Sequence, residues 1–541
     1  MRKTLITVAI VALAVGVTTT GFAANRGATF TGVGEFPACT PQTPPDEFCT
    51  NFPYTAALAM TDDGSMIVGQ HALGTGGFLW TADTGLNTIG PINGGIYTGP
   101  NGDRISTTYA DDAVTFGWAG YWTGGFYPNQ TQIRIPLTEG FAPCGSSGLS
   151  AHGASDGWIV GLTWTDEDGN GNGCEGAQGF AWSEGTGTYI LDNSISGDGS
   201  YRANAVNTDG SVITGWSAPG RTASAWLNGT ETYLCTGDQA DWFCNEGWAV
   251  TPDGSTILFT GASPSDFNTR AATYDVATGA VYQLPFPDAG FDPQWDTFQG
   301  WDISSDGGTV VGEFGGGGFF GSPPYPVFYD ADLDMTIDLQ VMLLGQGLDD
   351  LFFWFLSSAT AVSADGKIIA GYGSSPNGWI ESYQVDISKV KVCHKPDGNG
   401  NGNDRTLTID WDSVADHMAH GDVLATCEFA RSDAASRFAE RRFEAASQGP
   451  GDDSRIDVQK ALKNRERQTG LSTDVPAVNI YTTIDGEVSE DVQSINNFTP
   501  EERMQNLRER LGRHRSLVPH PGEPVVGEGP CHEIRSYSGR P

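Results

Sequence analysis

Up to about residue 385, the alternation of apolar and polar positions is typical of short β-strands. No long apolar stripe with the helical period of 3.6 residues appears before about residue 430. One pattern recurs, in which a β-branched run ending in Gly follows a turn that contains Asp, as in AVSADGKIIAGYG (361–373). Asp-Gly between two apolar runs predicts a hairpin, because Gly accepts a positive φ and Asp hydrogen-bonds to nearby backbone.

This hairpin pattern occurs seven times, at spacings of 44 to 59 residues. Each copy precedes an aromatic strand, such as GGFLW (76–80) or ASAWL (223–227). Each unit therefore holds about four short strands, and such a sheet has two apolar faces that it covers only by stacking on similar sheets. The turn residues are Asp63, Asp112, Asp156, Asp209, Asp253, Asp306 and Asp365.

Repeats of this length and content predict an all-β fold, a seven-bladed β-propeller over residues 25–388. An open β-solenoid is the competing architecture, but its rungs are usually shorter and more regular. The seventh unit is followed at once by a different segment, so we expect closure of the ring to borrow a strand from GATFTGVG (27–34). The repeated Trp residues are expected in the core between blades, with sugar stacking as the alternative; they are Trp80, Trp122, Trp182 and Trp226.

Residues 1–24 have the pattern of a secretory signal peptide. Arg2 and Lys3 precede an apolar stretch from Leu5 to Val17, and small residues surround Ala23. No later segment has the roughly 18 consecutive apolar residues of a membrane span. We therefore expect a secreted or periplasmic protein with no membrane span after signal removal.

The charge distribution narrows the range of partners. The chain carries a net charge of −37, and residues from Ala430 onward contribute only −2 of it. Such an acidic protein repels nucleic acid, so no nucleic-acid partner is expected. The candidate partners that remain are a polysaccharide or an envelope protein, and the sequence leaves the oligomeric state open.

Eight of the nine cysteines fall into four close sequential couples, which suits an oxidising compartment. Connectivity does not follow from sequence, and Cys531 is left over. The expected pairs are Cys39 with Cys49, Cys144 with Cys174, Cys235 with Cys244, and Cys393 with Cys427.

Two segments are candidate metal sites. In WTDEDGNGNGCEG (164–176), Asp166, Asp168 and Asn170 alternate before Gly171, which resembles the start of a Ca²⁺ loop. The acid that closes such a loop is absent, and Glu175 is the candidate substitute. The alternative is an acidic loop with no ion.

The second candidate lies in residues 389–430, which we call the Cys/His module. His417 and His420 share one face of a short predicted helix that Asp412 caps and Gly421 ends. The expected disulfide brings His394 near this helix, and Asp422 or Asp416 completes a candidate site for Zn²⁺ or Cu²⁺. In the alternative interpretation these residues only pack and cap the helix.

The repeat pattern A-[VI]-[ST]-x-D-G-x-x-[IV]-x-G, followed by G-x-A-x-x-W, resembles the HAF repeats of secreted bacterial proteins over residues 55–385. The resemblance implies an exported, propeller-like domain and no particular reaction. The Cys/His module resembles a short module with the pattern C-H-x-P-x-G-N…A-H-x-A-H-G-D…C, found near the C-termini of exported bacterial proteins. That module implies no assigned activity.

The remaining chain, residues 431–541, is predicted to be a charged and largely flexible tail with short helices, such as 432–448 and 499–515. No known catalytic motif occurs in the strand–helix context that it requires, so no catalytic residue is predicted. We therefore expect an exported binding or scaffold protein that presents a propeller face to a ligand. The alternatives are a polysaccharide hydrolase or lyase, with carboxylates converging at the channel mouth, and a structural matrix protein.

Overall fold

The computed structural model shows how the repeats are arranged, over those parts of the chain that it describes. These are residues 27–36, 54–71, 76–102, 104–111, 114–123, 131–136, 149–155, 157–165, 176–197, 201–218, 221–235, 243–262, 269–287, 297–315, 324–395 and 404–432. The predicted signal peptide, the Ca²⁺ loop at 166–175 and the tail beyond Ser432 lie outside these residues.

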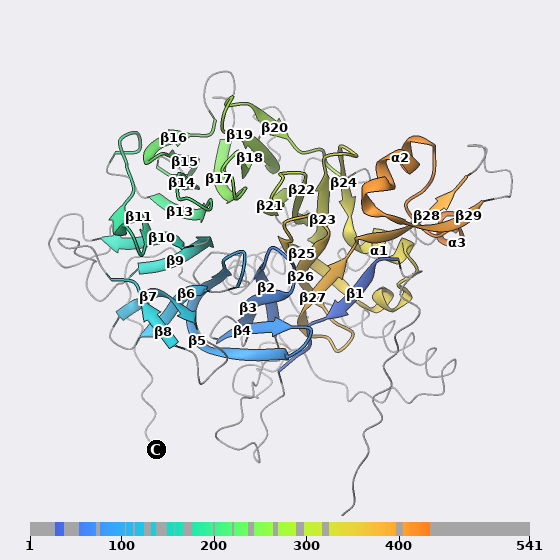
Figure 1. The fold of residues 1–541 in the computed structure, drawn as a ribbon, viewed down its shortest axis with the longest axis horizontal. Helices are drawn as coiled ribbons and strands as arrows, with labels where there is room; N and C mark the ends of the chain where they lie inside the picture. The colour runs from blue at the N-terminus through green and yellow to red at the C-terminus, as the bar shows by residue number, and fades with distance from the viewer. Residues whose placement is uncertain are drawn as a thin grey trace, which may run out of the picture.

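Seven four-stranded antiparallel units are arranged in a ring, as Figure 1 shows, and we call the interior of this ring, which the innermost strands line, the central channel. The predicted all-β, seven-bladed propeller is thus confirmed. Within each blade the first strand lies innermost, and the chain then moves outward by hairpins. The first blade comprises β2 (Thr55–Met60), β3 (Met66–His71), β4 (Gly76–Thr81) and the start of β5 (Gly85–Thr98). Strand β5 continues as the innermost strand of the second blade, so its hydrogen bonds join both blades into one seven-stranded sheet.

The other blades repeat this order. The second adds β6 (Ile105–Asp111), β7 (Val114–Thr123) and β8 (Thr131–Arg134), and the third contains β9 (Leu149–Ser155), β10 (Trp158–Thr165), β11 (Gly176–Ser183) and β12 (Gly187–Ile190). The fourth contains β13 (Tyr201–Val206), β14 (Val212–Ser217), β15 (Thr222–Leu227) and β16 (Thr230–Tyr233), and the fifth β17 (Phe243–Val250), β18 (Thr256–Ala262), β19 (Thr269–Asp275) and β20 (Val281–Gln283). The sixth contains β21 (Phe298–Ile303), β22 (Thr309–Phe314), β23 (Tyr325–Asp330) and β24 (Met335–Asp338).

The seventh blade closes the ring with a strand from the other end of the chain. It contains β25 (Phe355–Val362), β26 (Ile368–Ser374) and β27 (Ile380–Asp386), and its outermost strand is β1 (Thr29–Gly32). Thr29 pairs with Asp386 and Gly32 with Tyr383 in antiparallel register. The borrowed strand predicted at 27–34 is therefore confirmed, and Figure 1 shows β1 beside β27.

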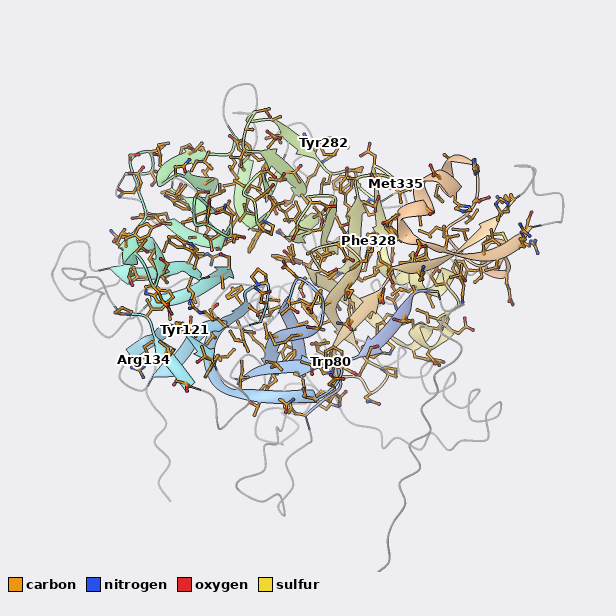
Figure 2. The ribbon with its side chains drawn as sticks, viewed as in Figure 1. Trp80, Tyr121, Arg134, Tyr282, Phe328 and Met335 are labelled. Carbon is orange, nitrogen blue, oxygen red and sulfur yellow. A yellow bond between two sulfur atoms is a disulfide. The ribbon has the colours of Figure 1, made fainter. Side chains whose placement is uncertain are left out.

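Apolar side chains fill the seven interfaces between adjacent blades, as Figure 2 illustrates. Trp80 of the first blade packs with Ala361 and Ala370 of the seventh, and Trp226 of the fourth packs with Val160 and Ala181 of the third. Trp122 and Trp182 belong to two further interfaces of this kind. The repeated Trp residues are thus core residues between blades, as the repeat positions predicted.

The hairpin turn between the first and second strands is built by side chains that bond to their own turn. In the first blade, the Thr61 hydroxyl donates to Asp63 Oδ1 at 2.8 Å, and that oxygen also accepts the Ser65 N–H at 2.9 Å. The Met66 N–H donates to the Thr61 hydroxyl at 3.1 Å. Equivalent bonds form around Asp209, Asp253, Asp306 and Asp365.

The predicted turn residue Asp112 lies outside the described residues. In the second blade, the first strand is the end of β5 and the second strand is β6, and no turn residue was predicted between them. The equivalent turn is at Asn101-Gly102, where Gly102 has φ +71° and donates its N–H to Gly99 O at 3.0 Å. Asn and Asp both tolerate tight turns and accept local backbone bonds, so the turn chemistry persists without the Asp. The third predicted turn residue, Asp156, lies outside the described residues.

Backbone hydrogen bonds link these turns around one end of the channel, which we call the turn end. Ser305 N–H donates to Ala364 O at 3.0 Å, and Ala364 N–H donates to Asp62 O at 2.8 Å. Asp62 N–H in turn donates to Pro100 O at 2.9 Å. Proline has no N–H, so Pro100 cannot continue the series to the next blade. The series thus joins the turns of four consecutive blades, from the sixth to the second.

The Cys/His module extends from the seventh blade and packs against the sixth. It comprises β28 (Lys389–His394), β29 (Arg405–Asp410), the 3₁₀ turn η5 (Trp411–Ser413) and the helices α2 (Val414–Ala419) and α3 (Cys427–Ala430). The helices α1 (Leu339–Gly345) and η4 (Asp349–Phe353) connect the sixth and seventh blades. Buried residues of α1, the seventh blade and the module share one apolar cluster, so the module is fixed to the ring.

Candidate functional site

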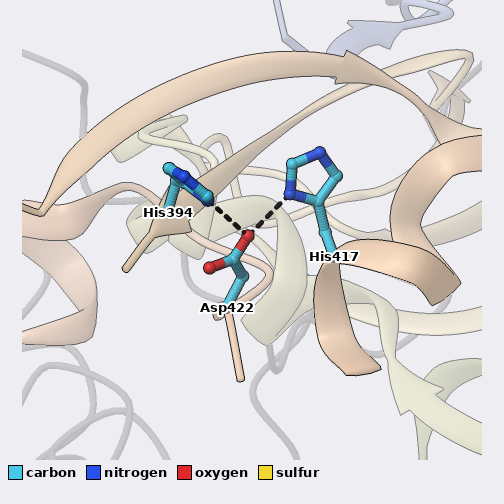
Figure 3. Close-up of side chains that lie close together, drawn as sticks. All are labelled: His394, His417 and Asp422. Atoms are coloured by element: carbon cyan, nitrogen blue, oxygen red, sulfur yellow. Dashed lines mark hydrogen bonds and ion pairs between the residues drawn. The ribbon is translucent and has the colours of Figure 1, made fainter. Parts of the chain in front are cut away.

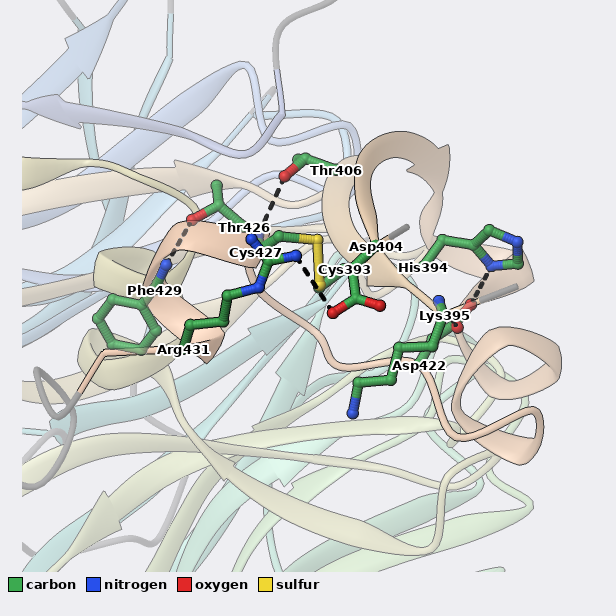
Figure 4. Close-up of a disulfide and its surroundings, with 10 residues drawn as sticks. All are labelled: Cys393, His394, Lys395, Asp404, Thr406, Asp422, Thr426, Cys427, Phe429 and Arg431. Carbon is green, nitrogen blue, oxygen red and sulfur yellow. Dashed lines mark hydrogen bonds and ion pairs between the residues drawn. A yellow bond between two sulfur atoms is a disulfide. The ribbon is translucent and has the colours of Figure 1, made fainter. Parts of the chain in front are cut away.

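The Cys/His module brings the end of a strand against the end of a helix. His394 is the last residue of β28, and its neighbour Cys393 pairs with Val423 through two backbone hydrogen bonds of 2.8 and 3.3 Å. Cys393 also forms a disulfide with Cys427, confirming that predicted pair (Figure 4). Asp422 directly precedes Val423, so this pairing places its carboxylate beside the His394 ring.

The end of α2 supplies the third residue of the cluster. Gly421 has φ +86°, a conformation that suits glycine at a helix end, and it turns the chain back on the helix. Asp422 N–H then donates to His417 O at 3.1 Å. His417 and Asp422 are five residues apart in sequence, and this turn brings their side chains into contact.

Both imidazoles contact one carboxylate oxygen, as Figure 3 shows. His394 Nδ1 lies 2.9 Å and His417 Nδ1 lies 2.6 Å from Asp422 Oδ2. The Lys395 N–H donates to the other oxygen, Oδ1, at 2.8 Å. Burial by itself would raise the pKa of Asp422, but the hydrogen bonds from His394, the Lys395 backbone and His417 lower that pKa to about 2. The carboxylate is therefore ionised at every physiological pH.

The donor set and its spacing fit a transition-metal ion. Two imidazoles and one carboxylate offer ligand atoms within 4.8 Å of one another. A tetrahedral Zn²⁺ with bonds of about 2.0–2.2 Å holds its ligands roughly 3.3 Å apart, so each imidazole nitrogen needs to move away from Asp422 Oδ2 by less than about 1 Å. The His394 and His417 side chains are 23% and 22% exposed, so the site can be reached from solvent. Three protein ligands would leave one position of the ion open.

The structure separates the predicted ligands into three groups. His394, His417 and Asp422 converge, whereas His420 is exposed and lies outside the cluster, with its ring 6.5 Å from that of His417. The Ca²⁺ candidates lie outside the described residues; they are Asp166, Asp168, Asn170 and Glu175.

In the Cys/His module, the structure corrects one prediction and adds one hydrogen bond that was not predicted. Asp412 does not cap the helix, because it lies inside η5 and forms an ion pair of 2.8 Å with Lys367 of the seventh blade. The hydrogen bond from the Lys395 N–H to Asp422 was not predicted. Its donor is a backbone group, which nearly every residue type has, so the sequence gives no indication of it. Among the other predicted disulfides, Cys235–Cys244 is confirmed, while Cys39, Cys49, Cys144 and Cys174 lie outside the described residues.

A second group of polar residues, which the sequence analysis missed, lies in the central channel. Glu246 of β17 is 1% exposed and forms ion pairs with both Arg202 of β13 and Arg221. Asn204 Nδ2 donates to Glu246 Oε1 at 2.6 Å and to Gly247 O at 2.8 Å. The only sequence signal was the occurrence of charged residues within strands whose neighbours are apolar.

Carboxylates also occur at the turn end of the channel, where a polysaccharide-cleaving enzyme would need them. Asp302 of β21 is partly buried, and its oxygens accept the Ile303 N–H and the Val362 N–H, each at 2.9 Å. Burial raises the pKa of Asp302 to about 6, against these hydrogen bonds, and the nearby charge of Asp62 adds to the rise. Because Asp302 links the sixth and seventh blades and Glu246 is paired with two arginines, this arrangement does not favour the hydrolase or lyase alternative.

Comparisons with known proteins add no family. No family model matches the chain, and no curated protein matches it either. Among solved structures, the chain is similar to TolB from Acinetobacter baumannii, with 14% identity over 53% of this chain and 64% of that one and a TM-score of 0.32. It is also similar to an oligogalacturonate lyase from Vibrio parahaemolyticus, with 10% identity over 67% of this chain and 98% of that one and a TM-score of 0.39.

A third similar structure is the β-propeller domain of the trilobed protease from Pyrococcus furiosus, with 11% identity over 67% of this chain and 99% of that one and a TM-score of 0.37. At such identities and TM-scores these likenesses carry no argument about function. In the described part of the chain, no helix combines the length and the apolar character that crossing a membrane requires.

Proposed function

We propose that the protein is an exported binding protein, in which a seven-bladed propeller carries a Zn²⁺- or Cu²⁺-binding module. The observation that supports this proposal best is the convergence of His394 and His417 on the buried carboxylate of Asp422. The adjacent disulfide supports an oxidising compartment, either the periplasm or the outside of the cell. The propeller presents its channel mouth to a ligand at the envelope, which we expect to be a polysaccharide or another envelope protein.

The arrangement of the ligands favours a metal that binds nitrogen and oxygen donors. Neutral imidazole suits Zn²⁺ and Cu²⁺, and an ionised carboxylate adds the negative charge that a divalent ion needs. Held by three side chains, the ion would keep a position for a water molecule or for a donor group of the partner. The module is fixed to the sixth and seventh blades, so an ion bound there would sit at a defined place on the ring's outer side.

The test is metal binding by the full chain. The protein is loaded with equimolar Zn²⁺ or Cu²⁺, desalted and analysed by mass spectrometry, and its affinity is measured by calorimetry. We expect about one ion per chain, and His417→Ala is expected to lower the affinity by about tenfold or more. His420→Ala is the matched control, because that histidine lies outside the cluster. Equal affinity in the wild type and His417→Ala would contradict the metal site.

A further inference from the structure

The turn end of the central channel contains a cavity of about 190 Å³. Its walls are the ends of the innermost strands, and residues of all seven blades contribute to them. The cavity is distinct from the metal cluster, which belongs to the Cys/His module outside the ring (Figure 1). Its volume suits one amino-acid side chain or a similarly small group.

The charge in this cavity has one sign. Asp62 and Asp302 both line it, and among the described residues in its walls none is Lys, Arg or His. The two carboxylates are close enough for the charge of one to disfavour ionisation of the other. Asp62 is exposed and Asp302 is partly buried. A cation between them would relieve this repulsion, and the partial burial of Asp302 would strengthen its attraction to the cation relative to water.

The walls of the cavity also include two indole rings. Trp248 and Trp301, from the fifth and sixth blades, make an edge-on contact with ring centroids 4.8 Å apart, and Trp301 is the residue before Asp302. Indole faces attract cations, and the planar guanidinium group both stacks on them and bonds to carboxylates.

The positive charge in the channel does not oppose a bound cation. Arg202 and Arg221 lie nearer the opposite end of the fourth blade, and neither lines the cavity. Both are paired with Glu246, which offsets part of their charge. The acidic and aromatic residues are therefore gathered at the open turn end, and the basic ones are paired further along the channel.

We propose that this cavity binds the guanidinium group of an arginine side chain, placed between Asp62 and Asp302 and against Trp248. This inference rests on the proposed binding function and names the class of ligand that the propeller takes. The source would be a basic segment of a protein partner or a free arginine derivative, since both present the same group. Neutral sugars would lack the charge that the two carboxylates attract.

The test uses the full chain after treatment with a chelator, so that metal plays no part. N-acetyl-arginine amide is titrated while tryptophan fluorescence and heat are recorded, with N-acetyl-citrulline amide as its uncharged control. We expect saturable binding of the arginine compound with a dissociation constant of about 1 mM or lower, weakened by added salt, and about tenfold weaker binding of the citrulline compound. Free L-arginine distinguishes the two sources: tighter binding of the capped compound supports a protein segment, and equal or tighter binding of free L-arginine supports a free arginine derivative.

Variants locate the site. Asp62→Asn keeps the backbone bonds of that turn and is expected to weaken arginine binding about fivefold or more, and Trp248→Leu about threefold or more. Asp332→Asn, an exposed carboxylate in the turn between β23 and β24, is the control and is expected to change nothing. Equal binding of both amides, binding unaffected by Asp62→Asn and Trp248→Leu, or fluorescence changes with a neutral trisaccharide alone would overturn the inference. Because metal loading is measured separately, failure of either result leaves the other standing.

Discussion

The indole Nε1–H of Trp411 donates a 2.8 Å hydrogen bond to Oδ2 of Asp330, and this bond joins the Cys/His module to the sixth blade. Both residues are only 7% exposed, and the Trp411 ring also packs on Phe328 with centroids 5.5 Å apart. The module is therefore held to the propeller by a buried polar contact surrounded by apolar packing. A buried carboxylate that loses its donor is costly, so this contact is open to a direct test.

Trp411→Phe keeps the aromatic packing and removes the donor to Asp330. We expect the free energy of unfolding to fall by about 1–3 kcal/mol, because Asp330 Oδ2 would lose its Trp411 donor inside the protein, while Oδ1 keeps the bond from the Leu333 N–H. Denaturant unfolding followed by circular dichroism measures the change. Phe352→Leu, an exposed position in η4, is the control and should alter stability by less than about 0.5 kcal/mol. A neutral Trp411→Phe variant would show that water replaces the lost bond.

Gly371→Ala tests the close approach of strands in the seventh blade. A Cβ at Gly371 would lie 2.1 Å from Ser358 O, a backbone atom opposite it, and 2.6 Å from the Tyr383 hydroxyl. We expect a loss of about 1–3 kcal/mol or more, measured by thermal unfolding, because the strand pair would have to separate. Gly185→Ala is the matched control, since its Cβ would meet nothing within 4 Å. Similar melting temperatures for the two variants would contradict this steric argument.

The Cys393–Cys427 disulfide is predicted to support metal binding indirectly, because Cys393 is the neighbour of the proposed ligand His394. Replacing both cysteines by Ser should lower the affinity for Zn²⁺ about tenfold, because Cys393 holds His394 in place beside Asp422. Replacing Cys235 and Cys244 by Ser is the matched control, because that disulfide belongs to the propeller. Calorimetry measures both, and an equal loss in the two variants would point to general destabilisation.

Asp302 gives the stability of the protein a distinct pH dependence. Its pKa of about 6 in the folded protein exceeds the usual value near 3.9, so the folded state binds the proton more tightly than the unfolded state. The contribution of Asp302 to stability is thus fully present below about pH 4 and is lost as the pH rises through 6. From pH 7.5 to pH 5, the wild type should gain about 1 kcal/mol relative to Asp302→Asn.

This comparison between variants is needed because other carboxylates act in the opposite direction. Hydrogen bonds from Ser65 lower the pKa of Asp63, and similar bonds lower that of Asp209. Such groups stabilise the fold at higher pH and lose their contribution at low pH, below the window used here. Denaturant unfolding at pH 5 and pH 7.5 provides the measurement, and parallel changes in both proteins would contradict the raised pKa of Asp302.

Most of the propeller could be predicted because its information is local. Asp63 and Gly64 bond within a few residues of their own positions, and equivalent bonds recur in four further blades, so a single chain displays the period several times. The strand at Thr29–Gly32 was predictable only because the seventh unit lacked a fourth strand. The turn between β5 and β6 was not predicted, because Asn101 there precedes Gly102 at the place where the other turns have Asp.

The candidate metal ligands were predictable for a similar reason, since His417 and Asp422 lie in one short segment and Cys393 fixes His394 beside them. His420 belongs to the same helical segment as His417 and is also a histidine, but it lies three residues further on, where its side chain is exposed to solvent. The channel residues could not be foreseen from any local pattern. Asp62, Trp248 and Asp302 come from three different blades, and the sequence around each residue indicates only an ordinary strand or turn.

The amino-acid sequence alone therefore determined the repeating unit, its strand content and most of its turns, since each depends on neighbours along the chain. Only the tertiary structure decided that the Cys/His module packs on the sixth blade and that carboxylates and indoles from separate blades meet at one end of the channel. The physical reason is ring closure: it brings together residues far apart in the chain, such as Thr360 and Ala57, whose bond of 2.8 Å spans 303 residues.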